Sequence, residues 1–145
     1  MDGPNILRHN FLERQYSKTI REQRGIAAME DREQLELIVK AAQGTRAEDI
    51  IVFDMEKRSS VTDFVLICSG RSQAHVRGIS DRIEESLRES GIRCGSLEGY
   101  QEGSWVLLDY GVVIVHIFHP ETRIYYDLEE LLVRYPSQRH EVLPG

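Results

Sequence analysis

Apolar residues recur along this chain with a helical period in two places. The first pattern begins near Glu30 and has its apolar face at Leu35, Ile38, Val39 and Ala42. Gly44 follows as a helix stop. The second pattern follows Ser72, a good N-cap residue, and ends at Gly91. Its apolar face comprises Val76, Ile79, Ile83 and Leu87. Both patterns predict helices that pack one face against a sheet.

Uninterrupted apolar runs predict the strands of that sheet. Residues 49–54 and 64–69 predict two buried strands, and a shorter strand is expected over 93–97. Residues 105–109 and 112–118 flank a tight turn that contains glycine, which predicts an antiparallel hairpin. A short amphipathic helix is then expected from Ile124 to Val133, ending before Pro136.

These elements follow one another in the order αββαβββα. We therefore expect an α/β fold, a mixed sheet of about five strands with flanking helices, in a nucleotidyltransferase-like arrangement. The second strand, the helix after it and the third strand can form a right-handed crossover unit. A chain of 145 residues is most economically one domain, which buries roughly two-thirds of its unfolded surface without a metal or a disulfide.

The two ends of the chain have weaker patterns. Residues 1–28 contain five basic and three acidic residues without a clear period. Three interpretations stay open for them: a flexible N-terminal extension, translation that begins instead at Met29, and a mitochondrial targeting peptide, which the acidic residues disfavour. The domain is expected over 29–136, followed by a C-terminal tail over 137–145.

Charge narrows the class of partner. The net charge is −6 for the whole chain and +2 for residues 1–28, so the remainder has a net charge of −8. This acidity argues against direct nucleic-acid binding through phosphates and favours docking on a basic protein. No apolar stretch approaches the ~20 residues that cross a bilayer, and no secretory signal is visible. We expect a cytoplasmic protein without a membrane partner.

The residue types that bind metals do not form a usual pattern. Cys68 and Cys94 lie far apart in the sequence, and Cys68 lies in an apolar run where a small buried residue is expected. His116 and His119 are three residues apart but would need further ligands. We expect His116 to be packed with one ring nitrogen hydrogen-bonded. No metal, cofactor or catalytic residue is expected.

Three stretches of the chain form a collinear set over most of residues 30–133. They are Ser59-Ser60-Val61-Thr62-Asp63-Phe64 continuing to Ser72, Glu98-Gly99 followed by Trp105-Val106-Leu107-Leu108-Asp109-Tyr110-Gly111 and the strand to Phe118, and Arg123-Ile124-Tyr125-Tyr126-Asp127-Leu128-Glu129-Glu130-Leu131. In order and spacing they resemble the Iojap/ribosomal silencing factor family. Two positions depart from it: Val112 stands where the family usually has a second Asp, and Leu132 where it often has Trp. Each departure is expected to weaken contacts at the partner surface.

The resemblance implies a non-enzymatic interaction protein. Members of that family bind the large ribosomal subunit through its ribosomal protein number fourteen, whose basic surface lies where the small subunit docks. Binding there blocks subunit joining by occupancy and represses translation when nutrients are scarce. We also expect a homodimer in the absence of the ribosome.

The residues expected to bind the partner are Trp105, Asp109, Tyr125, Tyr126, Leu128, Glu129, Leu131 and Leu132. Trp105 fits a core residue or an interface anchor, and its place at a strand start favours partial exposure. Adjacent Tyr125 and Tyr126 cannot face the same way on a helix. Asp109 is expected to stabilise the hairpin through backbone amides, with an interface role as the alternative. Glu129 fits either a solvated helix face or a charged rim.

Two other functions stay open. The turn at Gly70, which opens a helix, superficially resembles the phosphate-binding loop of a nucleotidyltransferase. That chemistry needs closely spaced carboxylates for Mg²⁺, and Asp109 stands alone in its strand. The other alternative is a dimeric adaptor unrelated to ribosomes.

Overall fold

The centre of the sheet is the parallel pair of β2 (Phe64–Ser69) and β5 (Val113–Phe118), which are in register along their whole length. The computed structural model describes residues 30–55, 62–134 and 138–142 of the chain. Every residue of both strands is buried, as expected for uninterrupted apolar runs. The expected N-terminal extension, residues 1–28, lies outside the described residues.

The sheet has six strands in the order β3-β4-β5-β2-β1-β6. β1 (Glu48–Asp54) is antiparallel to β2, and β4 (Trp105–Asp109) is antiparallel to β5. β3 (Ser96–Glu98) and β6 (Gln138–Glu141) form the two edges. The predicted mixed α/β sheet and its hairpin are confirmed.

Three details correct the expectations from the sequence. β6 lies within the expected tail, because its backbone pairs with the open edge of β1, a partner that its polar sequence does not reveal. The third strand begins at Ser96 rather than Arg93. It is also not a neighbour of β2, since β4 and β5 lie between the two. The connection from β2 to β3 therefore passes two intervening strands.

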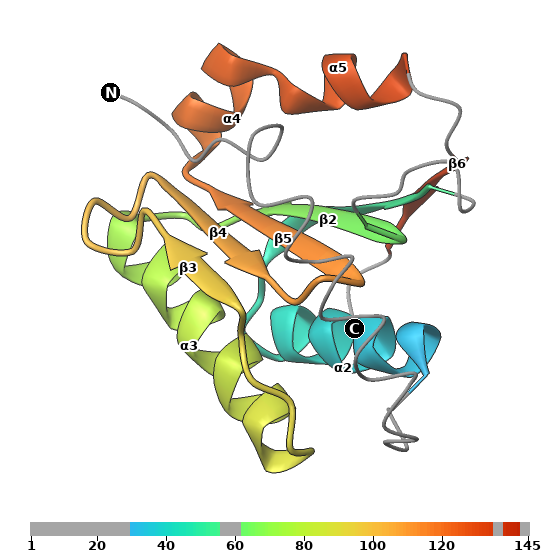
Figure 1. The fold of residues 1–145 in the computed structure, drawn as a ribbon. Helices are drawn as coiled ribbons and strands as arrows, with labels where there is room; N and C mark the ends of the chain where they lie inside the picture. The colour runs from blue at the N-terminus through green and yellow to red at the C-terminus, as the bar shows by residue number, and fades with distance from the viewer. Residues whose placement is uncertain (1–29, 56–61, 135–137, 143–145) are drawn as a thin grey trace.

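Helices cover both faces of the sheet (Figure 1). α2 (Asp31–Gly44) and α3 (Gln73–Glu89) lie on one face, and the short α4 (Pro120–Tyr126) and α5 (Leu128–Val133) lie on the other. Strand residues alternate between the faces, so the odd and even positions of each buried strand contribute to different hydrophobic clusters. The sheet is thus the middle layer of three.

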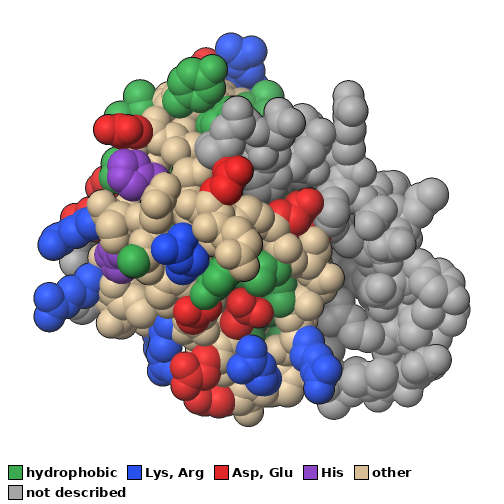
Figure 2. All heavy atoms as spheres, turned by 90° about the vertical axis from the view of Figure 1, so that its left-hand side faces the viewer, with side chains coloured by type: hydrophobic (Ala, Val, Ile, Leu, Met, Phe, Trp, Pro, Cys, Tyr) green, Lys and Arg blue, Asp and Glu red, His purple; other side chains and the backbone are tan. Residues whose placement is uncertain are grey.

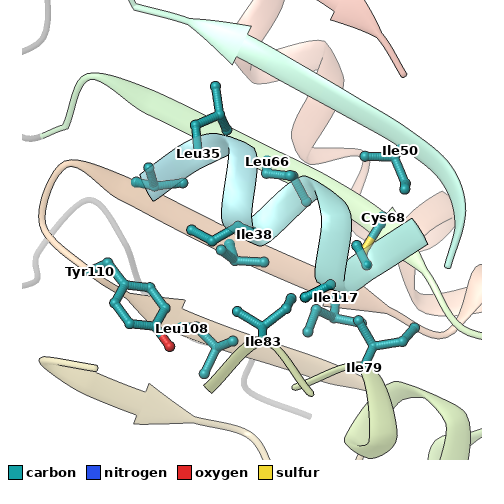
Figure 3. Packing of buried hydrophobic residues seen from close by; sticks show 14 of the residues in the cluster. Leu35, Ile38, Ile50, Leu66, Cys68, Ile79, Ile83, Leu108, Tyr110 and Ile117 are labelled. Carbon is teal, nitrogen blue, oxygen red and sulfur yellow. The ribbon is translucent and has the colours of Figure 1, made fainter. Parts of the chain in front are cut away.

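The larger hydrophobic cluster lies between the sheet and the helices α2 and α3 (Figure 3). Ile38 of α2 and Ile83 of α3 point toward Leu66, Leu108 and Ile117 of the central strands. Each of these five side chains is fully buried or nearly so. This face supplies most of the hydrophobic stabilisation, whereas the opposite face has a smaller cluster beneath α4 and α5.

The start of α3 is fixed by a tight turn at the end of β2. The side-chain oxygen of Ser72 accepts a hydrogen bond from the His75 amide at 3.0 Å, which confirms the expected N-cap. A Cβ atom at Gly70 would lie 2.9 Å from the backbone nitrogen of Val76. Glycine at this position therefore allows the chain to turn from the strand directly into the helix.

We expect Ser72→Ala to lower the free energy of unfolding by about 1 kcal/mol, because the His75 amide loses its hydrogen-bond partner. Urea denaturation would measure the change. Ser90→Ala, an exposed serine at the other end of α3, is the matched control and should change stability by less than about 0.5 kcal/mol. Equal effects of the two substitutions would contradict the capping role.

Candidate functional site

α4 and α5 replace the single helix expected from Ile124 to Val133. The chain enters α4 through the N-cap His119, whose Nδ1 accepts from the Glu121 amide at 3.3 Å. Asp127 separates the two helices in a left-handed conformation with φ of 44°, which aspartate tolerates better than most residues. The result is a bent pair of helices of seven and six residues, too short to be stable without packing.

The inner side of this helix pair packs against the sheet. Leu128 and Leu132 of α5 are buried in the smaller hydrophobic cluster. The strand and loop residues around them are Ile51, Phe53, Met55, Val65, Ile67 and Phe118. On α4, the ring centroid of Tyr126 lies 4.9 Å from that of Trp105. α5 is therefore anchored by buried leucines, whereas α4 has no completely buried residue.

The outer side of the pair exposes large apolar side chains. Ile124 is 80% exposed and Tyr125 is 81% exposed, and Leu131 and Val133 of α5 are exposed as well. Figure 2 shows hydrophobic side chains at the top of the molecule, where α4 and α5 lie in Figure 1, with charged groups beside them. Tyr125 is exposed while Tyr126 packs against Trp105, as expected for adjacent helical residues. We call Ile124, Tyr125, Leu131 and Val133 the outer apolar residues.

Arg123 lies at the join between the helix pair and the sheet. Its side chain is only 11% exposed. Nε donates to Oε1 of Glu129 at 2.6 Å, and Nη1 donates to Oγ of Ser69 at 2.9 Å. The other carboxylate oxygen of Glu129 lies 4.0 Å from Nη2 of Arg139 on β6. Glu129 therefore has internal ion-pair partners and is not simply part of a solvated helix face.

Trp105 is a core residue, which corrects the expectation of partial exposure. Its side chain is 8% exposed, and its ring centroid lies 4.8 Å from that of Phe118. The indole Nε1 donates to Nδ1 of His116 at 2.9 Å. The expectation fails because α4, which covers the strand start, is formed by residues that come after Pro120. The local sequence around Trp105 does not show that cover.

His116 is packed with one ring nitrogen hydrogen-bonded, as predicted. It is fully buried, and burial lowers the pKa of its ring from 6.5 to about 3. Because Nδ1 accepts from Trp105, the neutral ring keeps its proton on Nε2. Nε2 has no hydrogen-bond partner within the part of the chain that the structure describes. His116 therefore contributes to stability as an uncharged residue.

Asp109 lies at the opposite end of β4 from Trp105. Its Oδ1 accepts from the Gly111 amide at 2.8 Å, so the expected role in the hairpin is confirmed. In the β4–β5 register Asp109 stands opposite Ile114, whereas Trp105 stands opposite Phe118. Four residues of strand separate the two positions by about 13 Å. The structure thus does not bring Asp109 to the α4–α5 surface.

The predicted partner-binding residues divide between the two sides of the helix pair. Tyr125 and Leu131 lie on the outer side, while the others on α4 and α5 pack inward or form the ion pair. Sequence reasoning missed the exposed Ile124 and Val133 and the anchoring Arg123. A usable signal was present at residues 124–126: three successive large residues cannot all face inward on one helix.

The turn at Gly70 does not assemble a phosphate site. The Gly70 amide donates to the Phe118 carbonyl at 2.9 Å, and the Arg71 amide donates to Nδ1 of His75 at 2.9 Å. Both amides are therefore already engaged. β2 and β5 both end beside this turn. Asp109 pairs with Ile114 near the start of β5, so it lies at the other end of the sheet. Within the described residues no group of three or more His, Cys, Asp or Glu side chains could hold a metal ion.

A groove of about 970 Å³ lies beside this turn, between the start of β1, α4 and β6. Charged side chains of both signs line it, and several of them pair with one another. Nε of Arg71 lies 3.3 Å from Oε2 of Glu48, and Nη2 of Arg139 lies 3.6 Å from Oε1 of Glu141. Mixed, mutually paired charges give the groove no clear preference for an anion or a cation.

A search of the described helices for one with the length and the apolar character of a membrane span finds none.

Comparison with known proteins places this geometry in a family. A family model described as "Ribosomal silencing factor during starvation" matches residues 28–143. The chain belongs to the ribosomal silencing factor family. It is 44% identical over 97 residues to a ribosomal silencing factor of Bacillus subtilis, a match that covers 67% of this chain and 82% of that relative. The predicted resemblance is confirmed, and with it a role in translation regulation.

Two further proteins are similar to this chain. The crystal structure of a protein from Chromobacterium violaceum is similar with a TM-score of 0.70 and 33% sequence identity, covering 72% of this chain and 88% of that one. A mouse protein named "Mitochondrial assembly of ribosomal large subunit protein 1" is 28% identical over 102 residues. That match covers 67% of this chain and 44% of the mouse protein.

The two departures from the ribosomal silencing factor pattern lie in the interior. Val112 is 4% exposed and belongs to the larger hydrophobic cluster, and Leu132 is 4% exposed in the smaller one. Both positions suit apolar side chains, so the two residues contribute to packing. The expectation that they weaken contacts at the partner surface stays a prediction, and any such effect would act through packing.

We expect His116 to make the protein less stable in acid. Between pH 6.5 and about 3 the unfolded chain binds a proton that the folded chain does not, which disfavours folding by about 1.4 kcal/mol per pH unit. From pH 7 to pH 5 the wild type should therefore lose about 2 kcal/mol more stability than His116→Gln. Urea denaturation at the two pH values measures this. Parallel losses in both proteins would contradict the assignment.

Proposed function

We propose that this chain binds the large ribosomal subunit through its ribosomal protein number fourteen and blocks association with the small subunit. The observation that carries the proposal is the exposure of Ile124 and Tyr125 on the outer side of α4. Large apolar side chains at such positions are typical anchors of protein interfaces. Membership of the ribosomal silencing factor family supports a ribosomal partner, and the name of the mouse relative points to the large subunit.

Charge supports a basic protein as the partner. The chain from residue 29 onward has a net charge of −8. Glu121 of α4, Glu130 of α5 and Asp127 between the two helices are exposed. Carboxylates around an apolar centre attract a basic surface over long range and raise the association rate more than the affinity. The resemblance implies that the exposed face of protein fourteen is such a surface.

The proposed mechanism is steric. An interface of ordinary size buries about 800 Å² on each partner. The sheet and the helices α2 and α3 then stand away from the contact and occupy space that the small subunit needs. No bond is made or broken and no cofactor takes part. We place this action in the cytoplasm and propose no enzymatic activity, since the described Gly70 turn lacks the carboxylates of a nucleotidyltransferase.

We expect Tyr125→Ala to weaken binding to isolated large subunits about thirtyfold, equivalent to about 2 kcal/mol, because it removes an exposed aromatic anchor. Its free energy of unfolding should change by less than about 0.5 kcal/mol. Co-sedimentation with large and small subunits, followed by a subunit-rejoining assay, measures the effect. Leu97→Ser is the matched control, since Leu97 is also an exposed apolar residue (41%) but lies on the β3 edge.

The wild-type protein should sediment with large subunits, not with small ones, and should reduce the yield of joined ribosomes. Failure to bind large subunits even at low salt would overturn the proposed function. Equal weakening by Tyr125→Ala and Leu97→Ser would place the docking surface elsewhere on the domain.

We also propose that the outer apolar residues join two copies of the free protein into a homodimer that the ribosomal partner separates. Apolar surface left in water favours self-association. Light scattering should give the mass of a dimer for the free chain and a one-to-one complex after protein fourteen is added. Tyr125→Ala should shift the free protein toward monomer. A dimer that persists in the complex would contradict this proposal.

A further inference from the structure

α4 has an unusual balance between what it exposes and what it buries. Among the described residues, Ile124 and Tyr125 are the most exposed large hydrophobic residues, yet α4 has no buried residue. Seven residues are too few for a helix to be stable without tertiary contacts. Its orientation therefore depends on partly buried side chains. Among them are Tyr126, whose ring packs against Trp105, and Arg123, which hydrogen-bonds to other elements.

Arg123 is the side chain that joins α4 to two other elements at once. It donates to Ser69, which is 3% exposed at the end of β2, and to Glu129 on α5. A guanidinium group is planar and its donors point in fixed directions. Two simultaneous hydrogen bonds therefore restrict both the rotation of α4 about its axis and its distance from α5. The ammonium group of a lysine, a single compact centre on a flexible stem, would not reproduce this two-point geometry.

We propose that Arg123 is the positioning residue of the docking surface: by joining Ser69 to Glu129, it holds α4 in the orientation that presents Ile124 and Tyr125. The role of this orientation in binding rests on the proposed function. The statement that Arg123 holds α4 concerns the free protein alone. Ile124 and Tyr125 directly follow Arg123 in the chain, so a rotation of α4 that releases the guanidinium also redirects both side chains.

Loss of the Arg123 hydrogen bonds should lower the fraction of molecules in which α4 has the binding-competent orientation. If α4 samples several orientations, only the fraction in the competent orientation binds, and the apparent affinity falls by that fraction. The association rate should fall more than the dissociation rate rises, because the contacts of the bound state are unchanged. A residue that only stabilised the whole domain would instead lower the melting temperature and leave the association rate of the folded protein unaltered.

The test compares Arg123→Met, Arg123→Lys and a control, Arg134→Met, in the full-length chain. Arg134→Met removes the same charge, but among the described residues Arg134 forms only an exposed ion pair, with its Nη2 3.2 Å from Oε1 of Glu130. Hydrogen exchange followed by mass spectrometry reports on residues 120–133 and, as an internal reference, on β2 and β5. Binding rates to isolated large subunits are measured in parallel.

In Arg123→Met, exchange over residues 120–133 should be at least tenfold faster, with β2 and β5 unchanged and the association rate lowered about tenfold. Arg123→Lys should fall between this variant and the wild type, and Arg134→Met should match the wild type in both measurements. If the single variant does not fold, the test is repeated with Arg123→Met combined with Glu129→Gln, which removes the carboxylate that has lost its Arg123 partner.

Unchanged exchange over residues 120–133 in the Arg123 variants would overturn the inference. Faster exchange with wild-type binding rates would overturn it too, because the surface would then not need positioning. If the wild-type protein itself does not bind large subunits, the proposed function fails. The exchange measurements on the free protein would still decide whether Arg123 holds α4.

Discussion

The parallel pairing of β2 with β5 is the constraint on which the rest of the structure depends. The six residue pairs from Phe64–Val113 to Ser69–Phe118 bring together segments almost fifty residues apart. Both strands end at the same end of the sheet, with Ser69 beside Phe118. β4 begins at that end, because it is antiparallel to β5. Ser69 and Trp105 therefore lie on either side of the point where the chain leaves the sheet to form α4. The pairing of β2 with β5 thus brings together Ser69 and Trp105, the two residues that Arg123 and Tyr126 of α4 contact.

The two faces of the sheet have different tasks. The face under α2 and α3 has the larger hydrophobic cluster and stabilises the domain. The other face has a smaller cluster and short helices, anchored by two leucines, one aromatic contact and the hydrogen bonds of Arg123. Short elements with few buried contacts are the ones that a protein can present to a partner without risk to its core.

Much of the fold could be predicted from the sequence because its signals are local. The boundaries of β2, the N-cap at Ser72 and the hairpin around Gly111 each follow from a few neighbouring residues. β6 could not be predicted in this way, since its polar sequence becomes a strand only through pairing with β1. The same limit applied to Trp105. A strand start usually borders solvent, but α4, which is formed by later residues, covers Trp105. The exposed apolar residues Ile124 and Tyr125 therefore lie on α4 and not on β4.

Family membership and physical reasoning supplied different parts of the picture. The comparisons establish membership of the ribosomal silencing factor family, whereas the exposure of Ile124 and the two hydrogen bonds of Arg123 come from the geometry alone. Three of the residues expected at the interface from sequence alone are instead buried beneath α4 and α5. Leu128, Leu132 and Trp105 support the surface from below, which explains why their residue types resembled those of an interface core.

The burial of Trp105 beneath α4 has a practical consequence. It is the single tryptophan of the chain, and its indole contacts Tyr126 and donates to His116. The emission of an indole ring depends on the polarity and hydrogen bonding around it. The protein therefore contains one intrinsic optical reporter, located directly under α4. Its spectrum records, without any label, whether that helix is seated on the sheet.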